Sequence, residues 1–63
     1  MSTYNIRVIL RVKDRIVLGS WDAEAKDFNS AWKRAERYSN FFSIEEDADE
    51  ILQIKVNKKD ESE

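Results

Sequence analysis

The sequence has no cysteine, no histidine, no proline and a single glycine. Without cysteine no disulfide can form, and without cysteine or histidine a zinc site lacks its usual ligands. Histidine is also the commonest general base, so its absence excludes Ser–His and Cys–His nucleophile pairs. Phosphate-binding loops need several glycines to bring backbone amides against a ligand. These absences predict a protein that is not an enzyme and that has no catalytic residue, metal ligand or cofactor site.

Length and composition fit a small folded domain. The 63 residues make one domain near the lower limit for independent folding. With 41% hydrophobic and 38% charged residues, the chain is typical of a folded protein and not of a disordered one. No apolar run is long enough to cross a bilayer, and no signal-peptide pattern opens the chain. Together with the absence of cysteine, this predicts a cytoplasmic location without membrane contact.

The one dense group of carboxylates is the run Glu45–Glu50 (EEDADE). It has neither the central glycine nor the length of a calcium-binding loop. An acidic surface loop also offers no apolar pocket in which one carboxylic acid of a catalytic pair would stay protonated. Ser43 and Glu46 have the spacing of a capping box. The sequence therefore predicts a solvated, capped helical turn from Ser43 to about Ala48.

The segment Tyr4–Val12 (YNIRVILRV) has the clearest pattern in the chain. Its even-numbered residues are apolar, and its odd-numbered residues are polar except for Ile9. This period of two, rich in β-branched residues, predicts a strand with one buried and one mostly solvated face. An apolar residue in the middle of the solvated face is expected of a central strand with a neighbour on each side.

Two further strands are predicted, over Arg15–Ala25 and Glu50–Asn57. The first follows Lys13-Asp14, a hairpin turn that lacks glycine and is therefore expected to be bulged or slightly longer than two residues. Gly19 indicates either a bulge or a close approach of the helix to the sheet. In the last strand the alternation predicts an inward set (Leu52, Ile54 and Val56) and an outward set (Ile51, Gln53, Lys55 and Asn57).

Between the second and third strands, an apolar stripe at helical spacing predicts an amphipathic helix of about four turns. Asp27 precedes the stripe and is the expected N-cap, because its carboxylate can accept the free backbone N–H groups of the first turn. The small Ala31 and Ala35 would let the helix lie close to the sheet. The stripe comprises Phe28, Ala31, Trp32, Ala35, Tyr38 and Phe42.

These elements predict one α+β domain of order ββαβ over residues 1–57, followed by a disordered polar tail over residues 58–63. The hairpin pairs the first two strands, and a right-handed crossover through the helix places the third strand on the far side of the first. The expected architecture is a three-stranded antiparallel sheet of order 2-1-3 with one amphipathic helix packed on one face.

The sheet face that the helix leaves uncovered, here called the open face, is the surface predicted to bind a partner. It is expected to carry a group of aliphatic side chains ringed by arginine and lysine, which is typical of an interface. In the alternative interpretation, long arginine and lysine stems simply cover isolated aliphatic side chains. The predicted contact residues are Arg7, Ile9, Arg11, Ile16, Leu18, Ile51 and Lys55.

Other uses of these elements remain open. The basic residues of the open face could contact phosphate, but the net charge of −2 and the lack of exposed aromatics on that face weigh against nucleic acid. Antiparallel pairing of the last strand with its own copy would give a homodimer, since both outer strands carry unpaired backbone groups. The acidic segments at 45–50 and 60–63 could imitate a phosphate backbone toward a basic partner.

The order strand–strand–helix–strand, with the residues GSWDAEAKDFNSAWKRAERYSNFF leading into SIEEDADEILQIKV, resembles many small accessory proteins encoded by bacteriophages. In size and layout the chain is similar to phage antitoxins of the Dmd type, which also have a tryptophan early in the helix, as Trp32 is here. The resemblance implies a non-catalytic inhibitor that binds a host protein, such as a toxin or a defence or nucleic-acid enzyme. It carries no functional residue over, because it consists of layout without a shared motif.

The expected function is therefore that of a small non-enzymatic protein-binding module, a phage-encoded inhibitor of a host protein that binds through the open face. The alternatives are a weak nucleic-acid-binding protein that uses the same basic side chains, and a homodimeric structural module.

Overall fold

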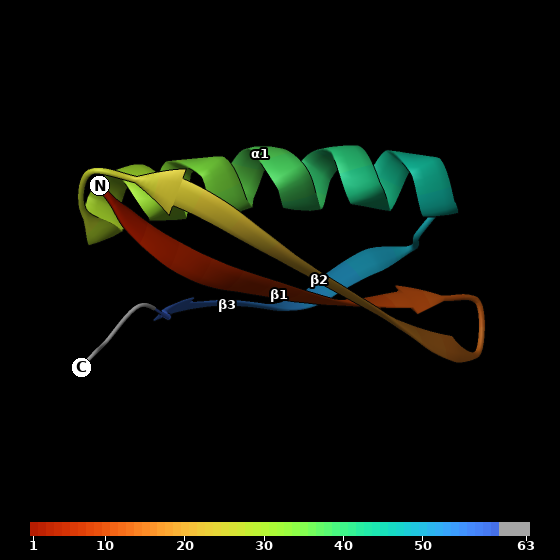
Figure 1. Ribbon diagram of the computed structural model, residues 1–63. Helices are drawn as coiled ribbons and strands as arrows, with labels where there is room; N and C mark the ends of the chain where they lie inside the picture. Colours follow the sequence, from red (N-terminus) through yellow and green to blue (C-terminus); the bar gives the residue numbers. More distant parts are fainter. Residues whose placement is uncertain (60–63) are drawn as a thin grey trace.

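The computed structural model describes residues 1–59, and Figure 1 shows its two layers. Strands β1 (Ser2–Val12) and β2 (Arg15–Ala25) form a hairpin, helix α1 (Phe28–Glu46) follows, and β3 (Glu50–Lys58) is the last strand. The sheet is antiparallel with the order β2-β1-β3, and α1 contacts all three strands from one side. The predicted ββαβ fold with a central first strand is confirmed.

The end of β3 lies beyond the predicted domain boundary. Lys58, which the sequence pattern assigned to the tail, is opposite Tyr4 in the sheet. The backbone N–H of Lys59 donates to the carbonyl of Thr3 at 2.8 Å, which continues the contact with β1. The rest of the predicted tail, residues 60–63, lies outside the described residues.

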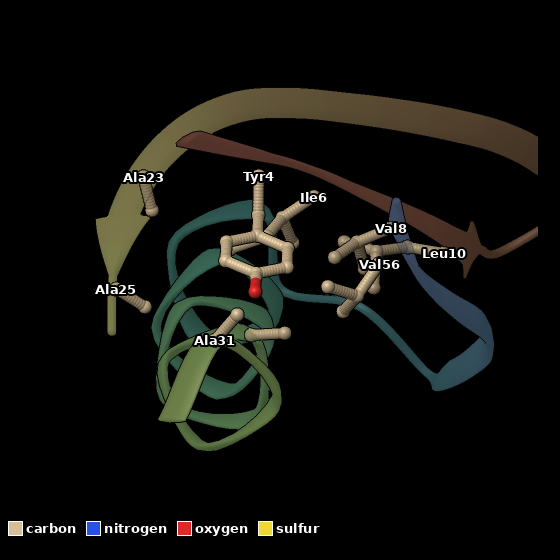
Figure 2. Close-up of a cluster of buried hydrophobic side chains, with 9 residues drawn as sticks. Tyr4, Ile6, Val8, Leu10, Ala23, Ala25, Ala31 and Val56 are labelled. Carbon is tan, nitrogen blue, oxygen red and sulfur yellow. The ribbon is translucent and has the colours of Figure 1, made fainter. Parts of the chain in front are cut away.

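The core lies between α1 and the helix-facing side of β1. Every even-numbered residue of β1 from position 4 to position 12 is buried, as the alternation predicts. Figure 2 shows Tyr4 reaching from β1 toward Ala31 on the helix. The buried set is Tyr4, Ile6, Val8, Leu10, Val12, Ala23, Ala25, Ala31, Ala35 and Val56.

Small residues let α1 lie close to the sheet. Ala31 and Ala35 have no exposed surface, and Ser39, one turn further on, is 1% exposed. The Ser39 hydroxyl donates to the carbonyl of Glu36 at 2.9 Å, so this buried polar group is hydrogen-bonded within the helix. The aromatic side chains Trp32, Tyr38 and Phe42 pack against the buried cluster from its margin.

Both ends of α1 have identifiable caps. Asp27 Oδ1 accepts the backbone N–H of Ser30 at 2.8 Å, which confirms the predicted N-cap. The predicted second start at Ser43 is wrong, because α1 continues without interruption to Glu46. The carbonyl of Ser43 instead accepts the N–H of Ala48 at 2.9 Å as part of the C-terminal cap.

Asp47, which ends α1, is in the left-handed conformation with φ 57° and ψ 47°. Glycine is the preferred residue there because it has no Cβ to clash in this conformation. Asp47→Gly should therefore raise the free energy of unfolding by about 0.5–1 kcal/mol in urea denaturation. Glu46→Gly, in the last helical position, is the matched control and should lower it by a similar amount, about 0.5–1 kcal/mol. Destabilisation by both variants would contradict the cap geometry.

The N-cap also makes the stability of the fold depend on pH. Hydrogen bonds from the backbone and side chain of Ser30 hold the pKa of Asp27 below its ordinary value. Because the folded-state pKa is the lower one, this stabilisation is present above the unfolded-state pKa of about 3.9 and is lost as the pH falls through the folded value. Asn is an equally good cap but carries no charge. The Tm of the wild type relative to Asp27→Asn should thus be higher at about pH 6 than at about pH 2.5, and a pH-independent difference would contradict this account.

A β-bulge near the start of β3 changes which side chains face the helix. Ile9 is opposite Gln53, but Leu10 is opposite Ile51, so Leu52 is the extra residue on β3. The extra residue reverses the alternation at the start of the strand. Ile51 therefore packs against the core, and Leu52 is 43% exposed. The predicted outward position of Ile51 and inward position of Leu52 are both wrong.

Candidate functional site

The open face is built from side chains that lie opposite one another across the three strands. The odd-numbered residues of β1 form its middle column, the even-numbered residues of β2 form one side, and β3 forms the other. The successive rows, each read from β2 through β1 to β3, are Asp22–Asn5–Asn57, Ser20–Arg7–Lys55, Leu18–Ile9–Gln53 and Ile16–Arg11–Glu50.

The second and third of these rows, here called the middle rows, line a hollow. Its volume is about 440 Å³, and it is lined by all six side chains of those rows together with Val8 and Gly19 of the underlying strands. Both Ile9 and Leu18 line it, but Ile9 is half-buried, whereas Leu18 is 71% exposed. Ile9 is thus on the open face, as the alternation in β1 predicts. An exposed leucine beside a half-buried isoleucine offers apolar surface that a partner could cover.

Arg7 and Lys55 lie directly opposite each other beside this hollow. Like charges opposite one another in an antiparallel pair destabilise the sheet. Among residues 1–59, the ion pairs are Arg11–Asp49, Arg11–Glu50 and Lys59–Asp22, so no described carboxylate neutralises Arg7 or Lys55. The centre of the open face is therefore positive.

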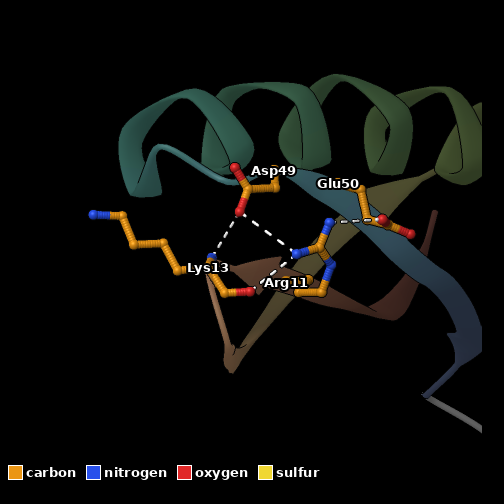
Figure 3. Close-up of polar contacts among 4 residues, drawn as sticks. All are labelled: Arg11, Lys13, Asp49 and Glu50. Atoms are coloured by element: carbon orange, nitrogen blue, oxygen red, sulfur yellow. Dashed lines mark hydrogen bonds and ion pairs between the residues drawn. The ribbon is translucent and has the colours of Figure 1, made fainter.

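Arg11, another predicted contact residue, is held by groups of the chain itself. Its Nη2 donates to Glu50 Oε1 at 3.0 Å, its Nη1 donates to the carbonyl of Lys13 at 2.9 Å, and Asp49 Oδ2 is 3.6 Å from Nη1 (Figure 3). Because two carboxylates and a carbonyl surround it, Arg11 offers a partner much less free charge than Arg7 does.

Asp49, one of the carboxylates beside Arg11, also contacts the β1–β2 turn. Val12 and Arg15 are paired, so the loop consists of Lys13 and Asp14 alone, and the expected longer or bulged loop is not found. Lys13 adopts the left-handed conformation with φ 58°. Its backbone N–H donates to Asp49 Oδ2 at 2.7 Å, as Figure 3 shows, which ties this turn to the segment before β3. At the end of the open face near the turn, the polar groups are therefore used in contacts within the chain.

A second polar cluster closes the other end of the open face. The Asn5 side-chain amide donates to Ser20 Oγ at 3.2 Å and to Asp22 Oδ1 at 3.1 Å. Lys59 Nζ lies 2.6 Å from Asp22 Oδ2. The hydrogen bond from Lys59, followed by that from Asn5, holds the pKa of Asp22 below its ordinary value. With both ends occupied by internal contacts, the middle rows are the part of the face that is left to bind a partner.

The structure brings together all of the predicted contact residues except Ile51, which belongs to the core. Ile16 is 59% exposed in the row of Arg11. Ser20 and Gln53 also line the hollow and were not among the predicted contacts. The alternation could have identified both, since it placed Gln53 outward and Ser20 shares the parity of Leu18.

A separate apolar pair lies on α1. Phe41 is 62% exposed and Ile44 is 78% exposed. These residues are three positions apart and fall outside the helix stripe that faces the sheet. The apolar stripe that predicts the helix does not include them, although two large apolar residues at this spacing on an otherwise polar helix face are a recognisable sequence signal.

Comparison of the chain with protein-family models, with curated proteins and with solved structures found no match. No helix in residues 1–59 combines the length and the apolar character needed to span a membrane. In the same residues no group of three or more acidic side chains is arranged to hold a metal ion.

Proposed function

We propose that this chain is a small, non-enzymatic, cytoplasmic module that binds another protein through the open face. One observation carries the proposal. The exposed Leu18 and the half-buried Ile9 form an apolar surface next to two cations, Arg7 and Lys55, that no described carboxylate neutralises. Apolar surface combined with unpaired charge is what a protein interface covers and neutralises on binding.

The composition of the open face favours a protein over a nucleic acid. Proteins that bind single strands stack bases on aromatic side chains along a basic groove. All the aromatic residues of this chain lie on α1 or at helix-facing positions of β1 and β2, as Tyr4 and Trp21 do. With Arg11 held by Asp49 and Glu50, the cations of the open face that are left for phosphate are Arg7 and Lys55. This number is small for binding driven by phosphate contacts.

The charge of the open face also disfavours a homodimer formed face to face. A two-fold axis through the hollow would bring Arg7 and Lys55 of one copy close to the same residues of the other. Like charges buried opposite each other oppose association.

The resemblance in layout to phage antitoxins suggests a bacterial host protein, such as a toxin or nuclease, as the partner class with which to begin.

The proposal is tested by comparing what matched variants capture from a bacterial lysate treated with nuclease. Arg7→Glu and Leu18→Asp change exposed side chains of the open face, and Arg34→Glu makes the same charge change on the solvent side of α1. Circular dichroism first establishes that each variant is folded. The wild type and Arg34→Glu should retain the same protein, and both open-face variants should lose it.

Equal capture by all variants would overturn the proposal. So would a species that is captured only from an untreated lysate, that is lost after nuclease treatment and whose binding weakens steeply with salt, since that is the behaviour of phosphate contacts. The nucleic-acid alternative would then replace it.

A further inference from the structure

Apolar and cationic side chains are segregated across the open face. Ile16 and Leu18 are on the edge strand β2, and Ile9 is opposite Leu18 on β1. The apolar part of the face therefore lies along β2. Arg7 lies two residues from Ile9 on the central strand β1, and Lys55 lies opposite it on β3, so the cations occupy the row next to Ile9 and extend toward the β3 edge. A complementary partner therefore needs an apolar stripe with acidic residues along one flank.

The width of the face is that of one helix. Neighbouring strands lie about 4.8 Å apart, so the distance from β2 to β3 across β1 is roughly 10 Å. An α-helix with its side chains is about 10–12 Å across. The other face of the same sheet already illustrates this fit, since α1 alone contacts all three strands there (Figure 1).

We propose that the occupant of the open face is an acidic amphipathic α-helix of the partner protein, an inference that rests on the proposed function. Its apolar stripe covers Leu18 and Ile9, and carboxylates on its flank pair with Arg7 and Lys55. The complex then has three layers, with the sheet between α1 and the partner helix. The carboxylates also remove the repulsion between two like charges that are opposite each other in the sheet.

Other occupants fit this pattern less well. An extended segment would add to the edge of β2 or of β3, and from either edge its side chains would reach only one side of the hollow. It would therefore contact either Leu18 or Lys55, but not both. A second copy of the chain would place cations against cations. An acidic helix that runs along the strands and is wide enough to cover all three contacts both sides of the hollow at once.

The test is an NMR titration of the ¹⁵N-labelled chain with a synthetic peptide of about five helical turns. The peptide carries leucines at i, i+3, i+4 and i+7 and glutamates along one flank, and circular dichroism establishes that it is helical. One control peptide has lysine in place of glutamate. A second has the same composition as the acidic helix, but its leucines and glutamates alternate as they would in a strand.

The acidic helical peptide should shift the amide signals of the two middle rows, with the largest changes at Arg7, Ile9 and Lys55. Arg7→Glu and Lys55→Glu should each weaken its binding by about tenfold or more, and Arg34→Glu by less than about twofold. Neither control peptide should bind in the concentration range of the acidic helix.

Three results would overturn the inference: equal binding of the alternating peptide, equal binding of the lysine peptide, or shifts centred on Phe41 and Ile44. Absence of binding by the acidic helix would overturn it as well. The lysate comparison separates this failure from failure of the proposed function. If Arg7→Glu still loses the captured protein while no helical peptide binds, the open face is an interface for a partner of another shape.

Discussion

Leu10→Ala should lower the free energy of unfolding by about 2–5 kcal/mol, and Leu18→Ala by less than about 0.5 kcal/mol. Leu10 has no exposed surface, whereas Leu18 is 71% exposed on the opposite side of the sheet. The same atoms are removed in both variants, but only the first leaves a cavity. The total stability expected of a chain of this length is about 3–9 kcal/mol, so Leu10→Ala removes a large part of it.

Urea denaturation followed by circular dichroism measures both changes. If Leu10→Ala is too unstable to give a folded baseline, Ile6→Val and Ile16→Val form a milder pair. Ile6 has no exposed surface and Ile16 is 59% exposed, so the first should cost about 0.5–1.5 kcal/mol and the second close to none. Similar costs within either pair would show that the two sheet faces are assigned wrongly.

Gly19→Val should destabilise the chain by about 1–3 kcal/mol. A Cβ on Gly19 would lie 2.6 Å from Cε2 of Phe42 and 3.0 Å from Cη2 of Trp21. The Phe42 ring packs edge-on against Trp21, with their ring centroids 5.1 Å apart, so displacing the ring to admit a side chain would disturb that contact. Of the two predictions for this glycine, the close approach of the helix is confirmed, and the β1–β2 register continues through it without a bulge.

Ser20→Val is the matched control for Gly19→Val, because the next side chain on β2 points to the open face. It removes the exposed hydrogen bond from Asn5 to Ser20 Oγ and should cost no more than about 0.5 kcal/mol. In a Phe42→Ala background the ring is absent, and Gly19→Val should cost less by about 1 kcal/mol, a coupling that a double-mutant cycle measures. An equal cost in both backgrounds would show that the Phe42 ring is not what excludes a side chain at position 19.

The fold could be predicted from the sequence because local patterns and connection rules agree. The alternation in Tyr4–Val12 identified the buried residues of β1, and Ile9 on the other parity indicated that this strand is central. Asp27 followed by an apolar stripe located the start of α1. Each of these features depends on residues that are close in the sequence, where period and capping chemistry are informative.

The errors arise where one local signal is compatible with two structures. Ile51 and Leu52 are both apolar, so the pattern of β3 reads equally well in either register, and the bulge that decides between them depends on pairing with β1. The serine and glutamate at 43 and 46 have capping-box spacing, but the helix that began at Phe28 simply continues through them. Ser39 is polar and so is not part of the apolar stripe, yet it is buried, because its small volume suits the contact with the sheet.

The electrostatics of the open face could not be predicted for a related reason. Arg7 and Arg11 occupy equivalent positions in the alternation of β1. Only the return of the chain after α1 brings Asp49 and Glu50 to Arg11, and no described carboxylate reaches Arg7. Contacts between residues almost forty positions apart distinguish a structural arginine from one available to a partner.

The absence of cysteine allows the most direct test of the open face as the interface. Ser20→Cys on β2 and Asn40→Cys on α1 each introduce a single thiol at an exposed position, and each can carry the same photo-crosslinker. After irradiation in a bacterial lysate, position 20 should give one crosslinked partner protein that position 40 does not. The same adducts from both positions, or a specific adduct from position 40 alone, would contradict the claim that the chain binds through the open face.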